Sequence, residues 1–269
     1  MSAAKKKTSK KKGIDGPPIT WEQARAFRLA RMHLADPLGP RSVRKVVRDL
    51  GGIQAQVASA GELQCAVRAQ GLAPGAIERA IYKQRTLVKS WMMRGTLHWV
   101  DAADYPVWAA ASRTRAPWNK KYWQKYFGVT GKQVEDAVDA IATALDRQCL
   151  TREQVADEVH ARVKNKAIDE LMRSGWGSVL KIAASQGTLC FGPNEGRNVA
   201  FVRPDQWLKG FKHLDTEKSI AEVLRRYLVA HGPATREEFA RWWGFQPADA
   251  RRVIESIENE LTLVDRDGD

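Results

Sequence analysis

The feature that most constrains this chain is a helix start that occurs twice. Thr151-Arg152-Glu153 and Thr235-Arg236-Glu237 each follow a helical stretch of similar length and a short break. Each threonine is followed three residues later by Gln154 or Glu238, the pattern of a capping box at a helix N-terminus. A helix, a break and a capped second helix, found twice, predict a repeated helix-turn-helix unit. The identity covers three residues, so chance is the alternative.

Stretches rich in β-forming residues follow the helical patterns. Two hairpins are predicted, one with strands over 87–91 and 96–100 around the turn Met93-Arg94-Gly95, the other with strands over 188–191 and 199–202 around a tip at 192–198. Helices followed by a hairpin are typical of a winged helix. We therefore expect a mainly α fold with small β-hairpins, built as tandem winged helix-turn-helix repeats.

The other helices follow from apolar spacing and from capping or breaking residues. They are expected over 20–35, 43–50, 134–145, 176–185 and 220–228. Leu261 to Val264 has the composition of a strand that runs into the turn dipeptide Asp267-Gly268. No returning strand follows, so we expect either an incomplete third wing or a truncated version of a longer protein.

These patterns divide the chain into five segments. They are a disordered basic tail (1–18), a first winged helix (19–110), a basic-aromatic linker (111–131), a second winged helix (132–210) and a truncated third one (216–269). The tail is rich in Lys, Ser, Gly and Pro, and its low apolar content cannot offset the entropy of ordering.

The charge of the chain favours a polyanionic partner. Of the formal net charge of +13, lysines between residues 5 and 12 carry six, which leaves +7 for the rest. A positive charge spread through folded sequence can attract phosphates, so nucleic acid is favoured over a membrane. The sequence has no secretory signal and no run near the roughly 18 apolar residues of a membrane span. We expect a monomer that is cytoplasmic and associated with the nucleoid.

The cysteines do not indicate a cofactor. Cys65, Cys149 and Cys190 are widely separated and match no zinc or redox spacing, which favours a reducing compartment. Neither a metal nor another cofactor is expected.

Residues 113–127 combine cations with aromatic side chains and include no acid. Arg113, Arg115, Lys120 and Lys121 are candidates for DNA backbone contacts, and the aromatic rings between them for stacking on unpaired bases. The alternative is an inter-domain helix whose aromatics are buried and whose cations are only solvated.

Gln54 and Gln56 lie just after the second helix with Ala55 between them. In extended backbone both amides would point to the same side, where together they can hold one water. An amide is a weak base, yet its oxygen can orient a nucleophilic water and lie near a developing positive charge. This chemistry suffices only for a leaving group that is already activated, such as a cationic N7- or N3-alkylated purine. The alternative is a pair of glutamines that bind loop backbone.

Arg94 and His98 lie on the first predicted hairpin. Arg94 is a candidate for a phosphate contact and His98 for the lining of a pocket, while a satisfied histidine within a sheet is the alternative. No Ser-His-Asp set, paired carboxylates or phosphate-binding glycine loop stands out.

Two stretches, 50–56 (LGGIQAQ) and 90–98 (SWMMRGTLH), resemble the AlkZ/YcaQ family of winged-helix DNA glycosylases. The resemblance continues through 187–207 and the third helix pair, so it covers nearly everything after residue 20. It implies three tandem winged helices around a concave DNA-binding face. Family members usually continue well past the point where this chain ends. This difference puts the DNA binding or the stability of the third repeat in question.

The resemblance also implies an activity, the excision of alkylated purines from duplex DNA and, in some members, of guanine-linked interstrand crosslinks. By position, Gln54 and Gln56 become the catalytic pair, which positions water and stabilises the oxocarbenium ion. A hairpin that probes the minor groove falls on 192–197, where Asn194 and Arg197 would contact DNA. The alternatives are a winged-helix regulator or nucleoid protein without enzymatic activity, and a catalytically dead fragment.

Overall fold

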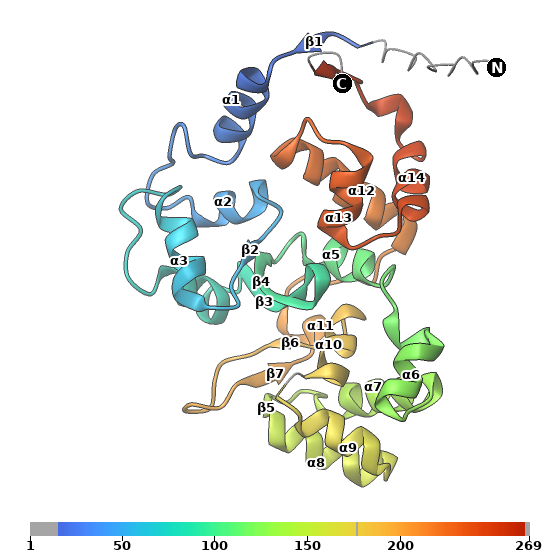
Figure 1. Cartoon of the computed structure of the whole chain (residues 1–269). Coiled ribbons are helices and arrows are strands. Elements are labelled where there is room, and N and C mark those ends of the chain that lie inside the picture. The colour runs from blue at the N-terminus through green and yellow to red at the C-terminus, as the bar shows by residue number, and fades with distance from the viewer. Residues whose placement is uncertain (1–15, 176, 267–269) are drawn as a thin grey trace, which may run out of the picture.

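The structure is a computed structural model that describes residues 16–175 and 177–266 (Figure 1). The helices are α1 (Trp21–Arg31), α2 (Val43–Asp49), α3 (Ala58–Ala66), α4 (Ala76–Glu78), α5 (Tyr105–Ser112), α6 (Lys121–Phe127), α7 (Gly131–Ala144), α8 (Arg152–Val163), α9 (Lys166–Arg173), α10 (Ser178–Ser185), α11 (Pro204–Trp207), α12 (Thr216–His231), α13 (Arg236–Trp243) and α14 (Pro247–Glu255). The strands are β1 (Pro18–Ile19), β2 (Ile53–Gln54), β3 (Leu87–Met92), β4 (Thr96–Asp101), β5 (Leu150–Thr151), β6 (Cys190–Phe191), β7 (Ala200–Val202) and β8 (Asp265–Arg266). This mainly helical fold with small sheets confirms the predicted fold class.

Two three-stranded antiparallel sheets have the same topology. The first has the strand order β2-β4-β3 and the second has the order β5-β7-β6. In each, a helix precedes the first strand, further helices follow it, and a hairpin completes the sheet. We call residues 19–110 with the first sheet the first unit, residues 132–210 with the second sheet the second unit, and residues 216–266 the third unit. In the third unit, α12, α13 and α14 follow one another without a sheet of their own among the described residues.

The capping boxes that define these helix starts are present. Thr151 accepts a hydrogen bond from the Gln154 amide N–H at 3.3 Å, and the Gln154 side chain accepts one from the Thr151 amide N–H at 2.7 Å. Thr235 and Glu238 form the same reciprocal pair. Each box satisfies N–H groups that the helix itself leaves unpaired, which fixes where the helix begins.

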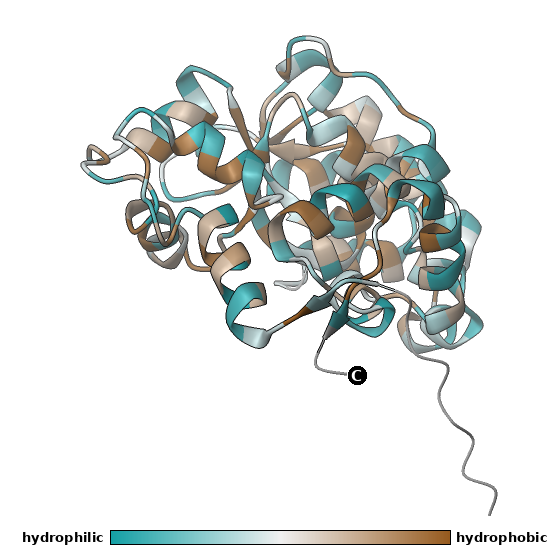
Figure 2. Ribbon diagram, turned by 90° about the horizontal axis from the view of Figure 1, so that it is seen from above, coloured by the Kyte–Doolittle hydropathy of each residue, from teal (hydrophilic) through white to brown (hydrophobic). Residues whose placement is uncertain are grey.

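The hairpin β3–β4 is the centre of the molecule rather than an exposed wing. Leu87 and Trp99 lie in the core of the first unit, beside α2 and α3. Val88 and Val100 lie in a core shared with α5 and the third unit. Trp91 packs into the core of the second unit. Because the hairpin is buried on both faces, it joins the three units. Hydrophobic residues gather toward the interior of the ribbon (Figure 2).

Several element boundaries differ from the sequence predictions. The strand expected at Leu261 to Val264 is wrong, because this segment is irregular and the strand begins at Asp265. It pairs in parallel with Pro18–Ile19, so chain ends far apart in sequence meet, which no local pattern indicates. Pro18 is thus already part of a strand.

Other predictions fall partly outside the described residues. Three parts of these predictions lie outside the described residues: the tail up to residue 15, Trp176 at the start of the expected helix 176–185, and the turn Asp267-Gly268. The described part of that helix is α10, which starts at Ser178, and α9 before it was not predicted. No described helix is both long enough and apolar enough to cross a membrane.

Candidate functional site

Gln54 and Gln56 lie on the open edge of the first sheet. β2 pairs with β4, with Ile53 opposite Trp99 and Gln54 opposite His98, and the Ala55 amide N–H donates to the Leu97 carbonyl at 2.8 Å. Ile53 and Ala55 are buried, whereas Gln54 and Gln56 are exposed. The alternation expected of extended backbone is present, and both amides are available from solvent.

Hydrogen bonds to backbone fix the two glutamines differently. The Gln56 side-chain oxygen accepts a hydrogen bond from the Leu97 amide N–H at 3.2 Å. This leaves its NH₂ group and one lone pair free. The Gln54 side chain has no hydrogen-bond partner among the described residues, but the backbone carbonyl of Gln54 accepts a hydrogen bond from the Gln64 side chain of α3 at 3.0 Å. The strand backbone is therefore held at Gln54 and Ala55, whereas at Gln56 the side-chain oxygen itself is bonded to the neighbouring strand.

Helix α3 sits against this strand through a close approach at Gly61. A Cβ atom at Gly61 would lie 2.7 Å and 2.8 Å from ring atoms of Trp99, and 3.2 Å from the Cβ of Ala55. Trp99 is only 3% exposed and is packed in the core of the first unit. Glycine at this position is what lets α3 bring Gln64 within reach of Gln54.

The first hairpin carries Arg94 and His98, and both side chains contact other groups of the protein. The Arg94 guanidinium donates to the carbonyl of Trp242 in α13, so it ties the hairpin tip to the third unit. His98 is buried, with its Nδ1 2.9 Å from the Thr96 carbonyl oxygen. Burial, and to a smaller extent the charge of Arg94, lower the pKa of His98 below its ordinary value. His98 thus has the geometry of a satisfied histidine within a sheet.

The cations of the basic-aromatic linker fall into two groups. Arg113 donates to the carbonyl of Gln186 at 3.3 Å and contacts His213 Nδ1 at 2.9 Å, and Arg115 packs beside Gly244. Lys120 and Lys121 are exposed. Of the four candidate cations, the two lysines therefore present their charge to solvent, as does Lys125 on α6, whereas the two arginines contact neighbouring units.

The aromatic rings of the linker are divided in the same way. Trp118 belongs to the core of the second unit, whereas Tyr122 and Tyr126 are 71% and 81% exposed on α6. The exposed rings stand beside exposed lysines, and the buried ring matches the inter-domain alternative.

Asn194 and Arg197 are exposed on the loop that joins β6 to β7. A bridge between Glu195 and Asn198 closes this loop, which projects from the body of the molecule on the same side as α3 (Figure 1). The loop thus leaves both side chains accessible to a large partner.

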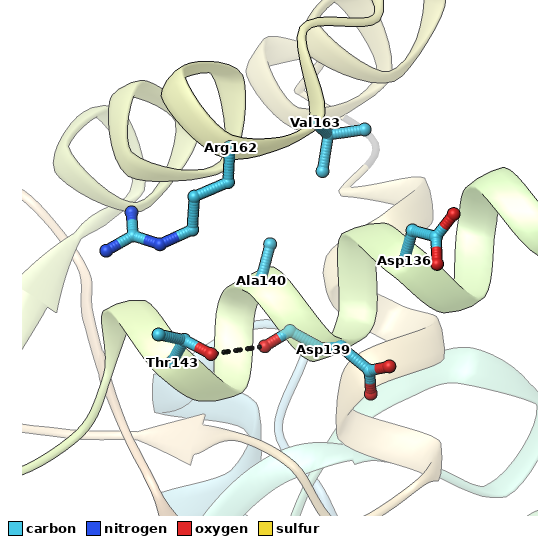
Figure 3. Close-up of a pocket in the computed structure, with 6 residues that line it drawn as sticks. All are labelled: Asp136, Asp139, Ala140, Thr143, Arg162 and Val163. Atoms are coloured by element: carbon cyan, nitrogen blue, oxygen red, sulfur yellow. Dashed lines mark hydrogen bonds between the residues drawn. The ribbon is translucent and has the colours of Figure 1, made fainter.

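Two pockets in the described part of the chain lie away from these glutamines. One, of about 360 Å³, lies between α7 and α8, where Thr143 donates to the Asp139 carbonyl at 3.0 Å (Figure 3). Asp136 and Asp139 line it, which disfavours an anionic ligand. The other, of about 420 Å³, is lined by Arg94, Tyr227, Glu238, Arg241 and Trp242. Gln54 and Gln56 line neither of these two pockets, and both side chains are exposed.

Two features of the site have no signal in the sequence. Gln64 reaches Gln54 from the second turn of α3, and Lys181 of α10 lies against Gly95 of the first hairpin. Both contacts depend on how elements pack rather than on a motif. Among the described residues, no group of three or more His, Cys, Asp or Glu side chains is placed to hold a metal ion.

Comparisons with known proteins agree on one family. The family model described as "DNA glycosylase AlkZ-like" matches residues 47–269. The interstrand DNA cross-link repair glycosylase of Streptomyces sahachiroi is 34% identical over 254 residues, which are 93% of this chain and 68% of that protein. The solved structure of Streptomyces sahachiroi DNA glycosylase AlkZ matches with a TM-score of 0.84 and 33% identity, over 94% of this chain and 69% of that one.

Proposed function

Because this chain belongs to the AlkZ-like DNA glycosylases, enzymes that hydrolyse the N-glycosidic bond, we propose that its substrates are cationic alkylated purines in duplex DNA and that Gln54 and Gln56 form the catalytic pair. The similar Streptomyces protein is named for interstrand cross-link repair. A crosslink through N7 of guanine carries the same positive charge as N7-methylguanine. We therefore include guanine-linked crosslinks among the substrates.

The observation that carries the proposal is the pair of exposed amides on a fixed strand edge. Ala55 is buried between them, and the backbone is bonded to Leu97 on one side and to Gln64 on the other. The strand edge is therefore fixed, and the Gln56 amide is fixed further by its bond to the Leu97 N–H, so little reorganisation is needed when charge develops on a sugar in front of it.

The chemistry follows from the charge of the leaving group. As the bond from C1′ to the purine breaks, its electron pair passes to the cationic base, which leaves neutral, and positive charge develops on the sugar. The amide oxygens stabilise that charge and orient a water that attacks C1′, and the water then loses one proton to solvent. Because the base is already cationic, no general acid is needed. No cofactor takes part in this proposal.

We further propose that Lys120 and Lys121, and Asn194 and Arg197 on the projecting loop, contact the DNA. All four are exposed, and the lysines add positive charge that phosphates can neutralise. Arg94, His98, Arg113 and Arg115 have protein partners or buried positions, so we assign them mainly to holding the units together. The enzyme is proposed to act as a monomer on nucleoid DNA.

The test is release of 7-methylguanine from a methylated duplex, with DNA affinity measured in parallel. Gln56→Ala and Gln54→Ala should each lower release at least tenfold while affinity changes little. Gln70→Ala, which removes an exposed glutamine elsewhere in the first unit, is the matched control. Wild-type protein that binds this duplex and releases no base would overturn the substrate assignment and favour the non-enzymatic alternative.

A further inference from the structure

Lys181 has an unusual environment for a lysine. It lies in the first turn of α10, which begins at Ser178 after Gly177 without a capping side chain. The N-terminus of a helix carries partial positive charge, so a cation there is disfavoured unless an anion compensates it. Lys181 is half-buried, and no carboxylate among the described residues pairs with it.

A second cation stands close by. Burial lowers the pKa of Lys181, and the positive charge of Arg152 lowers it further. Arg152 donates to the carbonyl of Ser174 at 2.6 Å and forms no ion pair within the described part of the chain. The matching residue of the other Thr-Arg-Glu start, Arg236, instead binds the carboxylate of Glu237 at 3.0 Å. The Ser174 carbonyl that binds Arg152 also accepts a hydrogen bond from the Gly177 N–H at 3.1 Å, so the Arg152 guanidinium lies at the start of the helix that carries Lys181.

This cation pair lies next to the catalytic edge. A Cβ atom at Gly95 would be 4.0 Å from Cδ of Lys181. Leu97 follows two residues after Gly95, and its N–H donates a hydrogen bond to the Gln56 side chain. Gly95 is the last residue before β4, and two residues of extended chain span roughly 7 Å. Lys181 therefore lies near the strand that holds Gln56, and Arg152 lies at the start of the helix that carries Lys181, where a single anionic group would compensate both charges.

We propose that Lys181 and Arg152 form a binding site for one phosphate of the DNA backbone, beside the nucleotide whose sugar faces Gln54 and Gln56. This inference rests on the proposed function for the identity of that nucleotide. The site holds the strand across the junction between the first and second units and so sets the distance of the sugar from the amides.

The test measures binding independently of catalysis. The probe is a duplex with a stable abasic analogue at the lesion position and a neutral methylphosphonate placed at one backbone linkage at a time. For the wild type, one linkage near the analogue should give a loss of affinity of about tenfold. Lys181→Met, which keeps the apolar stem, should bind the unmodified duplex about tenfold more weakly and lose its sensitivity at that linkage. Its salt slope should fall by about 0.9, the value for one phosphate contact.

Matched variants separate this site from general electrostatics. Lys181→Arg should restore most of the affinity, and Lys166→Met, on the exposed face of α9, should keep the full linkage profile. Thermal unfolding checks that each variant is folded. If Lys181→Met retains the wild-type profile and slope, the phosphate site is wrong even when base release is normal. If the profile follows Lys181 and the wild type releases no base, the site stands and the proposed activity fails.

Discussion

Gln54 lies directly opposite His98 across strands β2 and β4, so an exposed amide and a buried imidazole share one position of the sheet. His98 is held at the Thr96 carbonyl, 2.9 Å away, within a strand that also binds Ala55 and Gln56 through Leu97. The charge state of a buried side chain is thereby linked to the strand that carries the glutamines.

Acidification should weaken the fold through His98. Its pKa is lowered in the folded state, mainly by burial, from an ordinary value of 6.5. As pH falls through 6.5, the unfolded chain takes up a proton that the folded chain does not, so the free energy of unfolding decreases. His98→Asn, which keeps a donor for the Thr96 carbonyl, should lose less stability than the wild type between pH 7.5 and pH 5.0 in urea denaturation. His160→Asn, at an exposed site on α8, should behave as the wild type. Equal losses for His98→Asn and wild type would contradict this account.

Gln64 should act as a positioning residue for Gln54. Its side chain donates to the Gln54 carbonyl at 3.0 Å, and Gln64→Glu replaces that donor with an oxygen of the same size. A hydrogen bond of this kind contributes about 0.5–1.5 kcal/mol, so base release should fall roughly 2- to 10-fold in single-turnover assays.

The control for that variant is Gln70→Glu, which adds the same charge at an exposed position in the same unit. It should leave the single-turnover rate unchanged if charge alone has no effect. A loss of the same size in both variants would show that the added charge, rather than the bond to Gln54, slows the reaction.

Local features of this fold were predictable and contacts between units were not. The capping boxes at Thr151 and Thr235 depend on residues three apart, and both are present. The bond from Arg94 to the Trp242 carbonyl joins residues 148 positions apart, and it arises because the first hairpin is buried between all three units. Alternation at residues 53–56 could be inferred from extended backbone, whereas the approach of Lys181 depends on how α10 packs on that hairpin.

Gly61→Ala should destabilise the first unit although alanine favours a helix. The new methyl would lie within 2.8 Å of the Trp99 ring, which is buried in the core of the first unit. Overpacking of this kind costs about 1–3 kcal/mol, more than the roughly 1 kcal/mol gained in helix propensity. Because α3 must shift, Gln64 should also lose its bond to Gln54 and base release should fall. Ser59→Ala, at an exposed position of α3, should change the free energy of unfolding by less than about 0.5 kcal/mol. Higher stability for Gly61→Ala would show that α3 has room to yield.

The two groups of cations in the linker should differ in how they respond to salt. Lys121 is exposed on α6, whereas Arg113 is held by the Gln186 carbonyl and His213. A side chain that neutralises a phosphate releases bound counterions, and its loss lowers the slope of log affinity against log salt by about 0.9. Lys121→Ala should therefore weaken binding of an undamaged duplex and reduce that slope. Arg113→Ala should lower the thermal unfolding temperature while its slope stays near the wild-type value. An unchanged slope for Lys121→Ala would mean that α6 does not touch the DNA backbone, and a reduced slope for Arg113→Ala would mean that its contacts with Gln186 and His213 give way to phosphate when DNA binds.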